Sequence, residues 1–308
     1  MFKVSQPGRA ARASDDVKDR IVSFMKGAST EITPSEEDRL PELASVLAPG
    51  TAVYVAHTPH AAFEEVVHAA LAVSRAGFLA TPHIAVRRVP DSRTLRAALA
   101  ELRAGGVEHI LLIAGDAAQP MGEFSSTMDV LESGVLEESG IRQIGIAGHP
   151  QGHDSVASEL LWSALEAKQA LAERAALSMH IVTQFGLDAG AFKLWQAELV
   201  RRRIRLPVRV GIAGPTPVAR LMHFAIQCGI VSSMRVLAHN FGALSRSSEW
   251  AIRPEQHLTA ALRAPIPAQL VAPHFFAFGG ALETARWMRD VSAGAFDIDT
   301  GGAFRMHG

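Results

Sequence analysis

The sequence alternates short apolar segments with longer segments in which apolar residues recur at helical spacing. Eight apolar segments have the length of strands, and they lie at residues 29–33, 52–57, 78–86, 109–115, 143–149, 179–185, 208–213 and 270–278. Helical spacing is found at residues 36–46, 62–75, 93–103, 123–138, 155–175, 191–203, 218–228 and 283–290. Because strands that alternate with helices form parallel sheets, eight such units predict an α/β protein with a (β/α)8 TIM barrel.

The organisation of the chain favours a single domain. Neither a low-complexity linker nor a solenoid repeat divides the 308 residues, so we expect one barrel domain over residues 1–308 with an N-terminal extension helix. Thr33-Pro34 follows the first predicted strand, and Thr33 with Glu36 has the spacing of a helix capping box. The interval 215–269 is longer than the others and rich in Asn, Gly and Ser at 233–248, which predicts a helix plus an elaborated loop.

Composition and charge exclude several classes of protein. The chain is 48% hydrophobic with 30 Lys+Arg against 31 Asp+Glu, which argues against disorder and against nucleic-acid binding driven by bulk charge. The single cysteine, Cys228, cannot form an intramolecular disulfide, and the first residues lack the apolar core of a signal peptide. No uncharged apolar run approaches the roughly 20 residues of a membrane helix. We therefore expect a cytoplasmic protein without a membrane partner; a homo-oligomer stays open.

Polar side chains stand at the carboxyl ends of seven predicted strands, where (β/α)8 enzymes carry their active sites. These residues are Glu31, His57 with Thr58, His83, Gly115 with Asp116, His149, Thr183 with Gln184, and His274. Any one of them has an alternative interpretation as a helix cap or turn residue. Their coincidence at seven strand ends favours a functional site.

Two carboxylates are the candidate catalytic groups. Glu31 lies inside an otherwise apolar strand, where burial would raise its pKa and suit it to general acid catalysis. A structural ion pair is the alternative for Glu31. Asp116 follows Gly115, which permits close approach of a ligand or of the backbone, but an N-cap role for Asp116 is equally consistent with the sequence.

Metal and nucleotide motifs are weak or missing in the sequence. The nearest histidine pairs, His57 with His60 and His149 with His153, do not have the alternating spacing that places two side chains inside a barrel. We therefore expect no metal site. The glycines form neither a Rossmann fingerprint nor a P-loop, and Gly105-Gly106 has the position of a helix end.

The strand-end residues belong to motifs that resemble those of the methylenetetrahydrofolate reductase family, whose members are (β/α)8 enzymes. In chain order these motifs are Thr30-Glu31-Ile32-Thr33-Pro34, Thr81-Pro82-His83-Ile84, Ala114-Gly115-Asp116, Gly145-Ile146-Ala147-Gly148-His149-Pro150 with His153, Thr183-Gln184-Phe185, Val210-Gly211-Ile212 with Phe224, and His274-Phe275-Phe276. Any single match is weak. Seven in the same order on predicted strands make the resemblance specific, and they extend it over most of the chain.

The resemblance implies reduction of 5,10-methylenetetrahydrofolate to 5-methyltetrahydrofolate by NADH or NADPH, usually through bound FAD. It places Glu31 at the position of the general acid that helps to open the methylene bridge. It places Asp116 at the position of the carboxylate that contacts the pterin near the flavin. Gln184 takes the position of an amide that hydrogen-bonds the pterin. Phe224 takes that of an aromatic residue that stacks on the aminobenzoyl ring or on the nicotinamide.

The same resemblance implies a set of cofactor-binding residues, and it is here that the sequence departs from the family. The set comprises His57, His83, Gly115, Asp116, His149, His153 and Lys168. Ala114 replaces an Arg of the family, and the helical segment 155–175 lacks the usual Asp, Asn, Arg and Lys set, with Lys168 as the candidate replacement. Some relatives in this group transfer hydride directly from the nicotinamide, so a route through FAD and a flavin-free route both stay open.

Two further classes of function are compatible with these residues. Asp116 and Gln184 would hold a pterin equally well in a methyltransferase of one-carbon metabolism or in a non-catalytic folate carrier. Glu31 favours reduction, since protonation of the bridge nitrogen has a clear purpose there. The sequence leaves open the choice of NADH or NADPH, and it also leaves open whether the product serves methionine synthesis or folate-linked demethylation.

Overall fold

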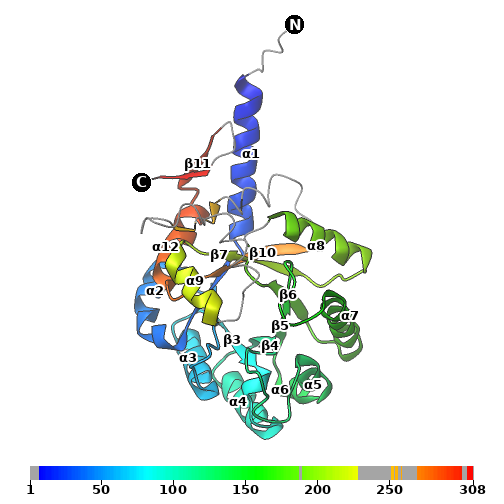
Figure 1. Cartoon of the computed structure of the whole chain (residues 1–308). Helices are drawn as coiled ribbons and strands as arrows, with labels where there is room; N and C mark the ends of the chain where they lie inside the picture. The colour runs from blue at the N-terminus through cyan, green and yellow to red at the C-terminus, as the bar shows by residue number, and fades with distance from the viewer. Residues whose placement is uncertain are drawn as a thin grey trace.

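The computed structural model describes residues 7–186, 189–227, 251–252, 254–255, 258, 269–299 and 304–307. Within this part of the chain, eight parallel strands close into a barrel in the order β1-β10-β7-β6-β5-β4-β3-β2 (Figure 1). The strands are β1 (Ser29–Ile32), β2 (Ala52–Val55), β3 (Leu79–Ala85), β4 (His109–Ile113), β5 (Gln143–Gly148), β6 (Met179–Thr183), β7 (Val208–Ala213) and β10 (Leu270–Phe276). Each lies inside one of the predicted segments, so the (β/α)8 barrel is confirmed.

Helices connect the strands and cover the outside of the barrel (Figure 1). They are α2 (Leu40–Val46), α3 (Phe63–Arg75), α4 (Ser92–Ala104), α5 (Thr127–Glu132), α6 (Val135–Ser139), α7 (Ser158–Ala175), α8 (Ala189–Arg201), α9 (Val218–Gln227) and α12 (Ala281–Ser292), with the 3-10 helices η1 (Pro34–Arg39) and η2 (Val86–Arg88). Their apolar faces belong to the core, in which Val66 of α3 and Leu99 of α4 are fully buried. None of the described helices combines the length and apolar character required to cross a membrane.

Two helical segments differ from the prediction because local residues interrupt them. The segment 123–138 forms two helices, α5 and α6, because Gly134 between them adopts a left-handed conformation with φ of 75°. The segment 36–46 begins as η1 and continues as α2, whose second residue, Pro41, has no N–H to donate into a preceding turn. The Glu36 carboxylate accepts a hydrogen bond from the Thr33 backbone N–H at 2.9 Å, as the capping box requires.

An extension helix, α1 (Pro7–Met25), precedes β1 as predicted. Its last turns bury Ile21, Phe24 and Met25, and it packs against α12, β10 and the strand β11 (Phe296–Ile298). The Lys18 ammonium donates a hydrogen bond to the Phe296 carbonyl oxygen at 2.6 Å. β11 pairs with β12 (Phe304–Met306) in an antiparallel ribbon. Because α1 leads directly into β1, it lies at the amino end of the strands, and Figure 1 shows it extending away from the barrel.

The long interval after β7 is partly described. The predicted helix is present as α9, and before it the short strand β8 (Thr216–Pro217) pairs antiparallel with β9 (Ala251–Ile252). The Asn-, Gly- and Ser-rich segment 233–248 lies outside the described residues.

The lumen of the barrel contains polar aromatic side chains where apolar branched residues are usual. Tyr54 of β2 lies with its hydroxyl 3.3 Å from Nε2 of His180 on β6, and its ring contacts the ring of His274 on β10, with centroids 4.4 Å apart. Burial lowers the pKa of His180 to about 3 and that of His274 well below its usual value, so both are neutral. Gly145 makes room for this cluster, since a Cβ there would lie 3.2 Å from His180 Nε2. These side chains lie beneath the candidate site.

Candidate active site

A pocket of about 830 Å³ opens at the carboxyl ends of the barrel strands. This is the end at which (β/α)8 enzymes bind their substrates. Every residue to which the family resemblance assigns a role lines this pocket: Glu31, His57, His83, Gly115, Asp116, His149, His153, Lys168, Gln184 and Phe224. The fold therefore brings the whole set together. Their individual roles stay predictions.

Glu31 is a buried acid in this pocket. It lies on β1 with 9% of its surface exposed, and backbone N–H groups of Ala277 and Phe278 donate hydrogen bonds to its carboxylate. Burial, with a smaller contribution from the negative charge of Glu36, raises the pKa of Glu31 to about 8. Glu31 is therefore protonated at neutral pH, as a general acid must be before it acts.

Asp116, in contrast, is an ion-paired carboxylate. Its Oδ1 accepts hydrogen bonds from Nη2 of Arg88 at 2.8 Å and from Nε at 3.1 Å. Arg88 lies on η2, and its Nη1 also donates to the Pro59 carbonyl oxygen at 2.7 Å, which ties together the loops that follow β2, β3 and β4. Gly115 has a positive φ of 87°, and a Cβ there would lie 3.0 Å from Ala85 Cβ, so close backbone packing accounts for this glycine.

His57 and His83 offer polar ring atoms to the pocket. Both are 8% exposed; the His57 ring interacts with the Ala61 backbone, and Nε2 of His83 has no hydrogen-bond partner among the described residues. Burial lowers the pKa of His57 to about 4 and that of His83 to about 3. Each neutral imidazole has one donor and one acceptor, so the pair is suited to the polar edge of a heterocyclic ligand.

The opposite side of the pocket is aromatic. Phe224 of α9 packs against Phe278, with ring centroids 5.9 Å apart, and Phe278 packs in turn against Phe185 at 5.0 Å. Phe276, at the end of β10, also lines the pocket. Gln184 follows β6 directly before Phe185, and its backbone N–H donates to the Gly148 carbonyl oxygen at 2.8 Å. A planar amide next to aromatic rings can bind a flat, polar ring system.

The loop from β5 to α7 brings two histidines together against expectation. His149 and His153 have ring centroids 5.3 Å apart, because the chain turns back after the strand instead of continuing in extended form. His153 lies at the exposed rim, where its Nδ1 accepts a hydrogen bond from the Ser155 backbone N–H. Burial lowers the pKa of His149 to about 4, so its ring is neutral at pH 7. The described residues contain no group of three or more His, Cys, Asp or Glu side chains that could hold a metal ion.

Three residues of the site were not predicted from the sequence. Arg88, the partner of Asp116, is one of two consecutive arginines directly after β3, and that position at a strand end was the available signal. Trp162 of α7 and Trp195 of α8 line the pocket, and their rings stack with centroids 5.9 Å apart. A tryptophan in an amphipathic helix is indistinguishable from a core residue in the sequence. His274, expected at a strand end, is instead fully buried in the lumen.

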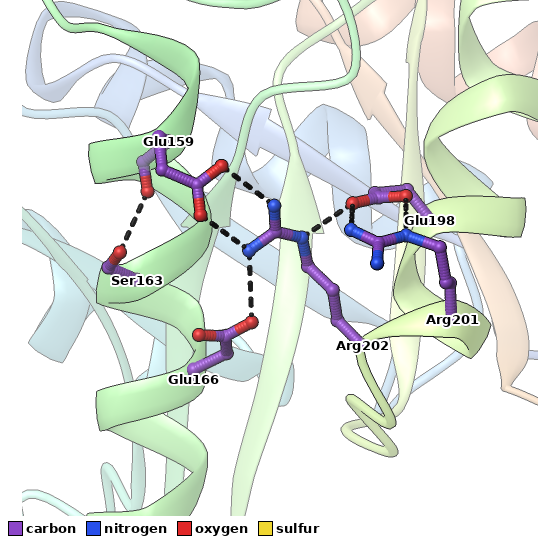
Figure 2. A network of polar contacts seen from close by, with 6 residues as sticks. All are labelled: Glu159, Ser163, Glu166, Glu198, Arg201 and Arg202. Carbon is purple, nitrogen blue, oxygen red and sulfur yellow. Dashed lines mark hydrogen bonds and ion pairs between the residues drawn. The ribbon is translucent and has the colours of Figure 1, made fainter.

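A network of ion pairs joins α7 to α8, and Arg202, which directly follows α8, lies at its centre (Figure 2). Arg202 donates to both carboxylate oxygens of Glu159 at 2.7 and 2.9 Å, to Glu166 at 3.1 Å and to Glu198 at 2.5 Å. The Arg202 guanidinium also lies 5.2 Å from the centre of the Trp162 ring. The network therefore fixes the position of one aromatic residue of the pocket.

The pocket residues are better suited to bind the ring of a flavin or of a nicotinamide than to bind a complete FAD molecule with its phosphates. Nε2 of His83 and Oε1 of Gln151, which have no hydrogen-bond partner among the described residues, suit a ring with polar edges. For the phosphates, α7 contributes one buried amine, Lys168, among apolar lining residues such as Leu165. A cationic cluster of the kind that neutralises a diphosphate does not line this side of the pocket among the described residues.

The fold and site define a (β/α)8 barrel protein with an acidic pocket residue at the carboxyl end of the barrel. No known protein-family model matches the chain. It is similar to the dihydropteroate synthase of Anaplasma phagocytophilum with bound 6-hydroxymethylpterin-monophosphate, at 12% identity over 86% of this chain and 98% of that one, with a TM-score of 0.44. The dihydropteroate synthase of Thermus thermophilus matches at 14% identity over 84% and 90% of the two chains, with a TM-score of 0.40. A putative phosphonomutase from Burkholderia cenocepacia J2315 matches at 11% identity over 75% and 98%, with a TM-score of 0.45. At these identities and TM-scores, the similarities say nothing about the reaction.

Proposed function

We propose that the protein is an enzyme that reduces 5,10-methylenetetrahydrofolate to 5-methyltetrahydrofolate with NADH or NADPH. The observation that carries this proposal is the burial of Glu31 in the pocket, in surroundings that favour the neutral form of its carboxyl group. A carboxylic acid with a pKa near 8 lies in the pocket that also holds the ion-paired carboxylate of Asp116. The environments of the two carboxyl groups favour a neutral Glu31 and an ionised Asp116. This difference supports a role for Glu31 as proton donor and for Asp116 as its electrostatic partner.

In this proposal Glu31 donates its proton to the nitrogen of the methylene bridge as the carbon–nitrogen bond opens. The product of that step is an electrophilic iminium carbon, which then accepts a hydride. The apolar surroundings of Glu31 favour its neutral form before the transfer, and the N–H groups of Ala277 and Phe278 stabilise the carboxylate afterwards. The residue is thus suited to give up one proton in each turnover.

The remaining pocket residues orient the substrate. Gln184 forms hydrogen bonds with the pterin edge, and Asp116, held in place by Arg88, meets the same ring. Phe224 stacks on the aminobenzoyl ring. A bound FAD, or the nicotinamide dinucleotide itself, supplies the hydride when it occupies the pocket. His57 and His83 are the residues that would hold the polar edge of that ring.

The test is an assay of nicotinamide oxidation with methylenetetrahydrofolate, using wild type and Glu31→Gln. The variant should lose reduction while calorimetry shows folate affinity within a few-fold of wild type. Glu37→Gln, a nearby surface carboxylate paired with His68, is the matched control and should keep full activity. Wild-type activity in Glu31→Gln would overturn the role of the acid. Folate binding without nicotinamide oxidation in wild type would favour a methyltransferase or a carrier.

The visible spectrum of the same protein after incubation with FAD and gel filtration separates the two hydride routes. A retained flavin spectrum that is bleached by NADH and restored by methylenetetrahydrofolate indicates the two-step route. A colourless protein that still oxidises NADH or NADPH with the folate substrate indicates direct transfer.

A further inference from the structure

Lys168 is a buried amine that faces the pocket. It lies on α7 with 8% of its surface exposed, and it has no hydrogen bond or ion pair with any of the described residues. Leu161, Ala164 and Leu165, on the same face of the helix, are apolar and also line the pocket. Burial in these surroundings lowers the pKa of Lys168 from 10.5 to about 8. A substantial fraction of the molecules therefore carries a neutral, nucleophilic amine at this position near neutral pH.

Among the described residues, the carboxylates on this side of the pocket are already paired. Glu166 lies two residues before Lys168 on α7, and its carboxylate accepts a hydrogen bond from Arg202 (Figure 2). Glu198 of α8 lines the pocket and is bound by Arg202 as well. His149 lies close enough for the charge of Lys168 to affect its pKa, but burial keeps its ring neutral at pH 7. The amine is therefore surrounded by apolar groups, with a neutral imidazole nearby.

These surroundings favour an uncharged ligand over an anion. Lys168 is the one lysine or arginine among the described residues that line the pocket, so the site lacks the several cations that a polyanion requires. The apolar side chains of α7 instead favour a molecule that buries apolar surface against them. The pocket, of about 830 Å³, has room for such a molecule beside the amine. An uncharged electrophile that reacts with a neutral lysine amine is a carbonyl compound.

We propose that Lys168 is a carbonyl-reactive lysine that binds an uncharged aldehyde covalently as an imine. The Nζ lone pair attacks the carbonyl carbon, and one proton moves from Nζ to the former carbonyl oxygen to give a carbinolamine. The remaining N–H proton leaves with this hydroxyl group as water when the C=N bond forms, so the step requires neither an oxidant nor a reductant. The neutral ring of His149 has one donor and one acceptor nitrogen and is suited to transfer these protons. The reaction is separate from the proposed folate reduction, in which Lys168 has no step.

The experiment is reductive trapping in the full-length protein at neutral pH with benzaldehyde and sodium cyanoborohydride, which reduces an imine to a stable secondary amine. Peptide mass spectrometry then measures the labelling rate of each lysine. Lys168 should be labelled at least about tenfold faster than Lys193, an exposed lysine of α8, because its neutral fraction exceeds that of an ordinary exposed amine. Labelling of Lys168 at or below the rate of Lys193 would overturn the proposal.

Two variants of Ala164 test whether the missing counter-charge makes the amine reactive. Ala164 is half-buried, and Ala164→Glu places a carboxylate four residues before Lys168, a spacing at which Glu and Lys form an ion pair on a helix. The labelling rate of Lys168 should fall about tenfold, because the carboxylate stabilises the ammonium form. Ala164→Gln, which has a side chain of the same size without the charge, should be labelled much faster than Ala164→Glu. Circular dichroism verifies that both variants are folded. Equal labelling rates in the two variants would contradict the proposal.

The charge of the aldehyde distinguishes a carbonyl site from an anion site. Benzaldehyde should label Lys168 faster than 4-carboxybenzaldehyde does, with the labelling of Lys193 as the reference for intrinsic reactivity. Faster labelling by the carboxylate-bearing aldehyde would overturn the proposal, because Lys168 would then act first as a binding site for an anion. Preferential labelling of Lys168 by benzaldehyde in a protein without reductase activity would support the reactive lysine and overturn the proposed function.

Discussion

The Tyr54 hydroxyl lies 3.3 Å from Nε2 of His180, and this contact joins β2 to β6, which are four strands apart around the barrel in either direction. The lumen is thus bridged by a polar contact between opposite walls. Burial raises the pKa of Tyr54 to about 12 and lowers that of His180 to about 3, so the contact is between two neutral groups.

Removal of this contact should cost stability without touching the pocket lining. Tyr54→Phe leaves the buried His180 Nε2 without its partner, and we expect the free energy of unfolding to fall by about 1–3 kcal/mol. Urea denaturation followed by far-UV circular dichroism measures the change. Tyr54 does not line the pocket, so ligand affinity should be retained. An unchanged midpoint of urea denaturation would show that the hydrogen bond contributes nothing to the free energy of unfolding.

Activity should decline with rising pH because of Glu31. If its neutral form is the proton donor, kcat falls as the pH rises through about 8, the pKa of this buried carboxyl. A profile of kcat from mildly acidic to alkaline pH, with binding measured in parallel, tests this expectation. A rate that increases across this range would contradict the assignment.

Stability should depend on the pH through the same group. The Glu31 carboxyl ionises near 4.5 in the unfolded chain and near 8 in the folded protein, so the unfolded state binds fewer protons between these values. The contribution of Glu31 to stability is therefore present below pH 4.5 and is lost as the pH rises to about 8. In thermal melts, the melting temperature should fall less between pH 5 and pH 8 in Glu31→Gln than in wild type.

Arg88 and Asp116 should act as a coupled pair. Arg88→Met releases the Asp116 carboxylate and the Pro59 carbonyl oxygen, and we expect it to raise KM for the folate substrate about tenfold or more. Asp116→Asn should have a similar effect. The double variant should be little worse than either single one, since both lose the same contact. Additive losses would mean that the two residues bind substrate independently.

Lys168→Met should stabilise the protein in the absence of ligands. Burial lowers the pKa of Lys168 from 10.5 to about 8, which makes the charged form unfavourable in the folded state at neutral pH. Removing the charge should raise the free energy of unfolding by about 1–3 kcal/mol. In wild type this destabilisation decreases as the pH rises from about 8 toward 10.5, because the unfolded state then binds more protons than the folded state. A destabilised variant would indicate a structural role for Lys168.

The strands were predictable because their periodicity and their buried, β-rich composition are local properties of the chain. The interruptions of the helices were predictable in principle too, since Gly134 and Pro41 are local signals for a break. The error at 123–138 arose because the apolar spacing continues across Gly134. Helical periodicity alone does not report a left-handed residue.

The strand-end residues of the site were predictable because a parallel barrel gathers all its carboxyl ends on one face. His274 was misplaced because it lies two residues before the end of β10, so that Phe276 lines the pocket and His274 lies below it in the lumen. Trp162 and Trp195 belong to helices, whose orientation depends on packing against the barrel. The pairing of Arg88 with Asp116 joins two loops 28 residues apart, and no periodicity reports such a contact.

The helix α1 ends where β1 begins, whereas the pocket opens at the other end of the strands. Its 19 residues correspond to a rod about 28 Å long that points away from the barrel (Figure 1). A probe or a solid support coupled to the exposed Asp15 of this helix, after exchange for cysteine, would hold the molecule with its binding face toward the bulk solution. The helix thus offers an oriented attachment point for a ligand sensor.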